Sequence, residues 1–477
     1  MFLGRLREYL QRPAGMRDVL ELALPLVIST ASWTVMQFVD RLFLLWYSQE
    51  ALAASMPAGM LAFLVVCFPL GVAGYANTFV AQYHGAGRPE RIGASVWQAI
   101  FLGVLAAPAV LATIPLAPAV FAWAGHAPEI AELEIVYYQL LCFGTPAMVV
   151  DWAISAFYSG RGDARTVAVV NVVSVAVNIV LDFLWIFGYA GFPEGGIAGA
   201  AWATVVAQWF RMGLWFVLFL RPMNRTRYLT WASCRWDREL FARLCRFGAP
   251  QGAQYLLELG GLSFFLLLIG RLGPLELTAS NLAFNVNSLA FMPVFGVGIA
   301  AATLVGQRLG ENRADLAQRA SWSAFWLSTL YMLSIGAVYV FGPDLLLAAH
   351  GAGSTDPAQF TRLRDLTTVL LRFVAFYCLF DSMNIIFSSA IKGAGDTKFV
   401  LYTTLTMAGV PALGTWLGVE MFGLGLMWAW TVLTVWVCVL AFAYLFRFTG
   451  GKWRSMRVIE TEALPDIDEA VAPAPAR

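Results

Sequence analysis

Four polar residues in the first half of the sequence could together bind a proton or a small hard cation. Asp40 lies near the end of one apolar stretch, and Asn178 and Asp182 lie one helical turn apart in another, so their side chains share a face. Thr204 lies about two turns into the next apolar stretch. Carboxylate, amide and hydroxyl oxygens suit a proton or sodium. The alternative is a buried polar network that only holds helices together.

A second set of acids lies in the second half of the sequence. Glu258 lies near the middle of one long apolar stretch, and Tyr377 and Asp381 lie one turn apart near the middle of another. Two carboxylates at one depth in an apolar medium cannot both stay charged without a partner, so this pair is predicted to hold a proton or a cation. A structural ion pair between Asp381 and Arg372 is the alternative, although nine residues separate the two on one helix.

Three further ionisable residues lie in apolar stretches without a clear set of partners. Asp151 and Arg211 could each belong to an internal salt bridge, and the long side chain of Arg41 could extend to the outer membrane surface. Each remains a functional hypothesis, because a charge inside a membrane costs several kcal/mol unless it is paired or hydrated.

The composition predicts that a lipid bilayer surrounds these stretches. The chain has 477 residues, of which 59% are hydrophobic and 13% are charged, whereas about 25% of the residues of soluble domains are charged. Twelve apolar segments each come near the roughly 20 residues that span a membrane. The predicted spans are 17–46, 55–81, 95–118, 133–158, 166–189, 196–220, 243–270, 279–306, 318–342, 366–391, 399–418 and 422–446. The predicted fold class is therefore an all-α polytopic membrane protein with twelve transmembrane helices.

The sequence repeats itself at an offset of 225 residues, which predicts two pseudo-symmetric six-helix bundles. The matched pairs are Pro25 and Pro250, Gly71 and Gly296, Gln82 and Gln307, Gly85 and Gly310, Arg88 and Arg313, and Trp97 and Trp322. The predicted units are an N-terminal interfacial segment (1–16), an N-terminal bundle (17–220), an Arg-rich connector (221–242), a C-terminal bundle (243–446) and a tail (447–477) that is disordered from about 458.

The loops predict the orientation of the chain and the rest of the sequence limits its partners. Loops rich in Arg and Lys alternate with loops that carry mostly Glu, so both termini and the connector are predicted to be cytoplasmic, in a multi-pass plasma (inner) membrane protein.

The net charge of +1 gives no reason to expect nucleic acid, and the three His and six Cys form no metal or disulfide pattern. No phosphate loop or nucleophile with its base is present, so no enzyme and no cofactor beyond a coupling ion are predicted.

Motifs in this order and spacing resemble the multidrug and toxic compound extrusion (MATE) family over about residues 17–446. They are LALPLVIS at 22–29, FVD at 38–40, NIVLD at 178–182, LVGQRLG at 304–310 and KGAGD at 392–396, with Pro250, Glu258, Tyr377 and Asp381 between them. The resemblance implies a V of two bundles around a central cavity, and alternating access driven by a cation gradient. It also implies a first cation site at Asp40, Asn178, Asp182 and Thr204. In the NorM-like branch a second site uses residues that match Glu258, Tyr377 and Asp381.

One residue departs from the family pattern. The family usually has a small polar residue after the aspartate of the first span, and this chain has Arg41. A fixed cation beside Asp40 could take the place of a bound cation, so we expect it to disfavour sodium at the first site.

The resulting functional hypothesis is a sodium- or proton-coupled antiporter that exports amphipathic, often cationic, organic compounds. Its partners would be these small molecules and membrane lipids, and the protein would act as a monomer. Candidate residues lining an aromatic cavity are Trp33, Met36, Gln37, Tyr255 and Phe284, although each could equally be an ordinary packing or lipid contact. The alternative function is a flippase for lipid-linked precursors with a related fold. A membrane receptor or scaffold is disfavoured by so many acids inside the spans.

Overall fold

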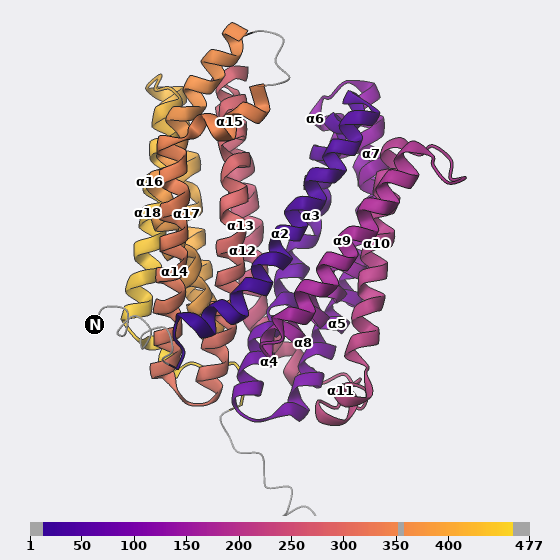
Figure 1. The fold of residues 1–477 in the computed structure, drawn as a ribbon, viewed down its shortest axis with the longest axis vertical. Coiled ribbons are helices and arrows are strands. Elements are labelled where there is room, and N and C mark those ends of the chain that lie inside the picture. The colour runs from indigo at the N-terminus through magenta and orange to yellow at the C-terminus, as the bar shows by residue number, and fades with distance from the viewer. Residues whose placement is uncertain (1–12, 352–356, 461–477) are drawn as a thin grey trace, which may run out of the picture.

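The computed structural model describes residues 13–351 and 357–460, and within these residues all regular structure is helical. Figure 1 shows two bundles side by side. The first contains α2 (Met16–Tyr47), α3 (Gln49–Gly74), α4 (Ala76–Gly85), α5 (Pro89–Leu111), η1 (Ile114–Leu116), α6 (Ala117–Ala124), α7 (Pro128–Cys142), α8 (Thr145–Gly160), α9 (Ala164–Phe187) and α10 (Gly196–Phe219). After α11 (Pro222–Arg227) follow α12 (Arg238–Gly270), α13 (Pro274–Gly310), α14 (Ala314–Phe341), α15 (Pro343–Gly351), α16 (Pro357–Ala394), α17 (Thr397–Trp416), η2 (Leu417–Met421), α18 (Leu426–Thr449) and η3 (Lys452–Ser455).

The helices are long and apolar enough to confirm the predicted fold class. Eleven helices in the described part of the chain could each cross a membrane, and the bent pair α7 and α8 would supply a twelfth span. The prediction treated 133–158 as one unbroken segment, whereas α7 and α8 meet at an angle of 43°. Pro146 lies in the first turn of α8, and a proline there favours a break just before it.

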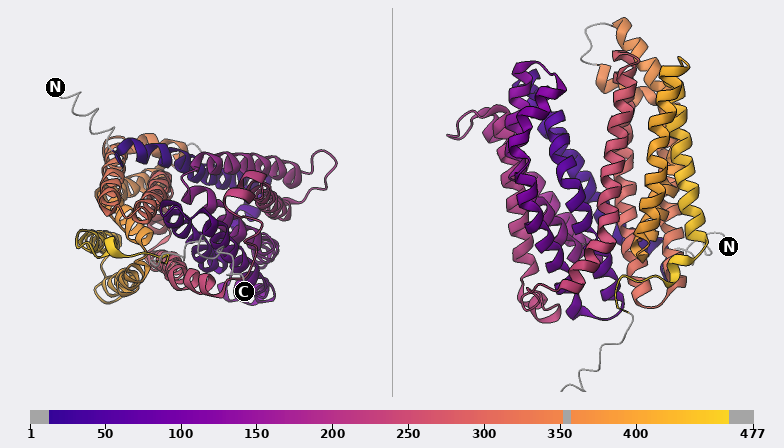
Figure 2. Two further views of the ribbon diagram at one scale, coloured as in Figure 1. Left: turned by 90° about the horizontal axis from the view of Figure 1, so that it is seen from below. Right: turned by 180° about the vertical axis from the view of Figure 1, so that it is seen from behind.

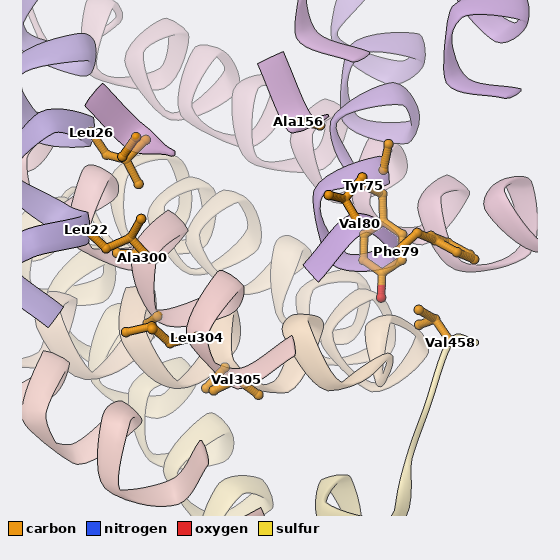
Figure 3. Close-up of a cluster of buried hydrophobic side chains, with 14 of the residues drawn as sticks. Leu22, Leu26, Tyr75, Phe79, Val80, Ala156, Ala300, Leu304, Val305 and Val458 are labelled. Carbon is orange, nitrogen blue, oxygen red and sulfur yellow. The ribbon is translucent and has the colours of Figure 1, made fainter. Parts of the chain in front are cut away.

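The two bundles meet at one end of the molecule, here called the contact end, which carries α11 and residues 452–460 (Figures 1 and 2). At this end a single hydrophobic cluster takes residues from both bundles, including Leu22, Phe79 and Val305 (Figure 3). Away from it the cores are separate: one cluster is built only from residues 265–437 and another only from residues 44–201. The bundles therefore share a core at the contact end and pack independently toward the far end, where α6 and α15 lie.

Glycines permit the close approach of the bundles, and their contacts are reciprocal between the two halves of the sequence. A Cβ added to Gly85 would collide with the carbonyl of Gln307, and one added to Gly310 would collide with the carbonyl of Gln82. A Cβ added to Gly71 would likewise collide with the backbone of Gly252, and one added to Gly296 would collide with the backbone of Val27. The offset of 225 residues found in the sequence relates the two contacts of each pair: it is added to the glycine of one contact and subtracted from that glycine's partner to give the other contact.

Several boundaries differ from those predicted. α12 begins at Arg238, inside the predicted connector, because the side chain of Asp237 accepts a hydrogen bond from the Leu240 backbone N–H and caps the helix. The tail was predicted to be disordered from about Val458, but Val458 and Ile459 are buried. The predicted interfacial segment lies mostly outside the described residues, since only positions from 13 onward are described. All six cysteines are free thiols.

Candidate ion-coupling sites

Asp40 and Asp182 form the centre of the polar cluster in the first bundle. Helices α2 and α9 pack side by side and bring the two side chains together inside the bundle, where Asp40 is 7% exposed and Asp182 is fully buried. Their carboxyl groups are close enough to influence each other electrostatically. Two carboxylates close together in an apolar interior repel each other, so the arrangement requires a proton or a cation between them.

Several buried polar atoms around this pair lack hydrogen-bond partners among the described residues. Both carboxylate oxygens of Asp182, both amide atoms of Asn178 and Oδ1 of Asp40 belong to this group. Asn178 is fully buried one turn from Asp182, as its spacing predicted. Unpartnered buried polar groups are costly, and a proton, a cation or water can satisfy them. The oxygen-rich set therefore fits a proton or sodium.

Thr204 lies farther along the same interior, in a small pocket of the first bundle. The pocket is lined by Trp33, Met36, Ser174, Val175, Thr204, Ala207, Gln208 and Arg211. Ser174 lies one turn before Asn178 on α9, so the pocket borders the acid cluster. Thr204 therefore lies near the cluster, and in the part of the chain that the structure describes no hydrogen bond joins it to either aspartate.

The acids of the second bundle are arranged more loosely. Asp381 is 8% exposed on α16, whereas the side chain of Glu258 on α12 is exposed. The two are close enough to interact electrostatically, but within the described residues no hydrogen bond joins them. Tyr377 is buried one turn from Asp381, and its hydroxyl accepts a hydrogen bond from the Asn287 amide at 3.5 Å.

Two partners of Glu258 were missed by the sequence analysis. Gln254 donates a hydrogen bond from Nε2 to Oε1 of Glu258 at 2.7 Å, and Lys392 interacts with Glu258 electrostatically. Gln254 lies four residues before Glu258 on one helix, so helical spacing could have revealed it. Lys392 comes from α16, and only the fold brings it to α12. The ammonium group of Lys392 therefore competes with any bound cation for the negative charge of Glu258.

The other predicted ionisable residues have separate locations. Asp151 on α8 and Arg211 on α10 form a buried ion pair, with Oδ2 and Nη2 2.6 Å apart, which confirms that they belong to an internal salt bridge. Arg372 is exposed beside the apolar side chains of α14, and no ion pair joins it to Asp381 among the described residues. Arg41 is exposed, yet it lies near enough to Asp40 to interact with it electrostatically.

The residues proposed to line one cavity do not lie together. Trp33 and Met36 line the pocket inside the first bundle. Phe284 stacks on Trp430 at 5.1 Å between ring centroids, within the core of the second bundle. Gln37 and Tyr255 are half-buried on α2 and α12, and Tyr255 lies near enough to Glu258 to interact with its charge. Phe284 therefore packs against the core of the second bundle, and a cavity-lining role for all five residues stays a prediction.

Comparison with known proteins agrees with this arrangement. The sequence model of the MatE family matches residues 25–184 and 250–417, one match in each bundle. A "Probable multidrug resistance protein NorM" of Thermotoga maritima is 25% identical over 461 residues, which cover 95% of this chain and 97% of the relative. A "Multidrug resistance protein NorM" of Vibrio parahaemolyticus is 24% identical, covering 83% of this chain and 86% of the relative.

Solved structures share the fold at lower sequence identity. One described as an outward-facing conformation of a multidrug resistance MATE family transporter of the MOP superfamily has a TM-score of 0.84 and 19% identity, and covers 94% of this chain and 98% of that chain. A MOP superfamily transporter from Pyrococcus furiosus has a TM-score of 0.83 over the same shares of the two chains. These structures support the two-bundle arrangement.

Proposed function

The chain belongs to the MatE family of membrane transporters, and from this premise we propose that it is an antiporter that exports amphipathic, often cationic, compounds in exchange for a proton or sodium. The relatives named as multidrug resistance proteins support the substrate class. We further propose that exchange proceeds by alternating access, in which the contact end opens as the far end closes. We expect the protein to act as a monomer surrounded by lipid.

One observation carries the proposal of ion coupling: Asp40 and Asp182 are buried on two neighbouring helices, among polar atoms that have no hydrogen-bond partner within the described residues. Such a pair is more stable with one bound proton or cation than with none, so the fraction of protein that carries a bound ion follows the ion gradient. Binding of an ion to the pair changes the charge inside the first bundle. An ion that binds one conformation of the transporter more tightly than the other shifts the equilibrium toward that conformation. The first bundle therefore supplies the coupling ion site in this proposal.

The coupling ion can be identified by transport into proteoliposomes that contain the purified protein. We expect uptake of a cationic dye under an imposed proton gradient and a smaller response to a sodium gradient, since Arg41 places a fixed positive charge beside Asp40. Empty liposomes and protein without a gradient are the controls. Uptake driven by sodium alone would contradict the preference for protons, and uptake under neither gradient would contradict coupled export.

The orientation of the chain can be tested by labelling single cysteines. We propose that the contact end faces the cytoplasm, because the Arg-rich connector lies there. In a cysteine-free background, Arg227→Cys in the connector should react only after the membrane is permeabilised. Glu194→Cys, in the exposed loop before α10, should react in intact cells. Labelling of both positions in intact cells would contradict this topology.

The role of the second bundle can be tested by removing the charge of Glu258. We expect Glu258→Gln to weaken the binding of a cationic drug about tenfold, because an exposed carboxylate near Lys392 and Asp381 supplies the negative charge that attracts it. The measurement is equilibrium drug binding to purified protein across pH and sodium concentration. Glu276→Gln, an acid near the start of α13, is the control. Unchanged affinity and unchanged ion dependence would leave coupling to the first bundle alone.

A further inference from the structure

The segment that follows the last helix crosses the contact end from one bundle to the other. It starts on the second bundle, where Trp453 is fully buried, stacks on Phe448 and donates a hydrogen bond to its carbonyl. Arg454 then donates to Oε1 of Gln318 on α14 at 2.8 Å. Four residues later Val458 lies in the hydrophobic cluster that both bundles share (Figure 3).

The backbone of Val458 is bound by side chains from both bundles. Its N–H donates to Oε1 of Gln82 on α4 at 2.8 Å, and its carbonyl accepts a hydrogen bond from Arg243 on α12. Gln82 is fully buried and also donates from Nε2 to the carbonyl of Gly393 on α16 at 3.0 Å. The Gln82 amide thus ties the tail to the first bundle and the first bundle to the second.

Glu460 completes this connection with charged hydrogen bonds to both bundles. Its carboxylate accepts from the Tyr83 hydroxyl at 2.8 Å and from Arg91 at 3.2 Å, both in the first bundle. It also accepts from Arg243 in the second bundle, and Arg88 donates to its backbone carbonyl. A single carboxylate cannot keep these partners when the bundles separate at this end, because the partners belong to different bundles.

The charge of Glu460 is stable across the physiological pH range. Burial raises the pKa of Glu460, but its own backbone N–H, the Tyr83 hydroxyl, Arg243 and Arg91 lower it further, to about 2. The stabilisation is therefore complete above the ordinary glutamate pKa and is lost only as the pH falls through about 2.

We propose that Gln82, Tyr83, Arg91 and Arg243 form a composite docking surface for the chain's own residues 456–460, and that this docked tail holds the contact end closed. The occupant is already seated in the structure, so the contacts themselves identify it. The inference rests on the proposed alternating access, since the tail must leave the surface when the contact end opens. Its effect is to set the equilibrium between the two conformations rather than to bind substrate or ion.

The experiment measures the opening of the contact end directly, without transport. Spin labels at Arg165→Cys on α9 and Lys398→Cys on α17 report the separation of the two bundles in a cysteine-free background, and both positions are exposed and outside the docking surface. We expect Glu460→Gln to increase the ratio of long to short distances about tenfold, because hydrogen bonds to charged groups are worth roughly one to two powers of ten in an equilibrium. Removal of residues 456–477 should increase it further.

Two controls separate the docked tail from a general loss of structure. Glu311→Gln breaks an ion pair with Arg308 that lies within the second bundle, so it should leave the distances unchanged. Arg243→Gln should act like Glu460→Gln, and the double variant should open little more than either single variant, because both remove the same contact. Thermal unfolding of each variant verifies that it is folded.

Two outcomes would overturn the inference: wild-type distances in both Glu460→Gln and the shortened chain, or an equal shift in Glu311→Gln. Failure of the proposed exchange has a different signature. A wild-type protein that carries no dye under either gradient, while the shortened chain still opens, would refute coupled export and keep the docking surface. Potassium chloride at 1 M should shift the distances measured in the wild type toward those of Glu460→Gln, because salt screens partly exposed ion pairs.

Discussion

Asp182→Asn should lower ion-driven export by roughly a hundredfold, while the protein remains inserted and folded. A factor of this size is near the upper end of the coupling usually found between two binding sites. The asparagine keeps the size of the side chain but cannot take up a proton, and it removes the negative charge that a cation would need. Asp40→Asn should have the same effect, because the two carboxyl groups are buried close together on neighbouring helices. Dye uptake into proteoliposomes under an imposed gradient is the measurement.

The matched control is Asp315→Asn, which removes an exposed acid near the start of α14 and should leave export unchanged. The double variant Asp40→Asn and Asp182→Asn should export no less than either single variant, since residues that act as one unit are not additive. If both single variants keep full export under a defined gradient, the cluster is a structural network and not the coupling site.

Arg211→Gln should destabilise the first bundle by about 3–5 kcal/mol, because it leaves Asp151 charged and buried without its partner. Asp151 is 3% exposed, and its Oδ1 has no hydrogen-bond partner within the residues that the structure describes. Denaturant titration of purified protein in detergent measures the free energy of unfolding. Replacing both residues with apolar ones of similar size, Asp151→Leu with Arg211→Met, should cost less than the single change.

The exposed pair Arg17 and Glu21 provides the reference for this measurement. Their side chains are 65% and 60% exposed, so Arg17→Gln should leave the free energy of unfolding nearly unchanged. If Arg211→Gln costs no more than Arg17→Gln, the Asp151 carboxyl is neutral in the wild type and the pair is not ionic. Export should also be measured, since the pair borders the pocket that contains Thr204.

The parts of the site that sequence analysis could predict are those set by regular helix geometry. The rise per residue and the one-turn spacing placed Asn178 beside Asp182 and brought Asp40 to the same depth, and in the structure both aspartates are buried on the neighbouring helices α2 and α9. The same arithmetic placed Tyr377 beside Asp381. The bend between α7 and α8 had a sequence signal in Gly144 and Pro146, but a continuous apolar pattern concealed it.

The features that could not be predicted depend on contacts between segments far apart in the chain. Lys392 reaches Glu258 only because α16 and α12 share a bundle, and Val458 is buried only because the contact end offers it a hydrophobic site. The acidic, Ala- and Pro-rich composition after Val458 predicted disorder from about that residue, yet Val458 and Ile459 are buried and Glu460 makes hydrogen bonds to both bundles. Composition describes an average over a segment, whereas docking depends on single side chains.

The reciprocal glycine contacts at the contact end have the form of an isologous interface. Gly85 meets Gln307 as Gly310 meets Gln82, and the offset of 225 residues exchanges the two contacts. This is the pattern of a two-fold symmetric homodimer, in which residue i touches j and j touches i. The two halves therefore meet as two copies of one six-helix subunit would, although the acids inside the two bundles differ.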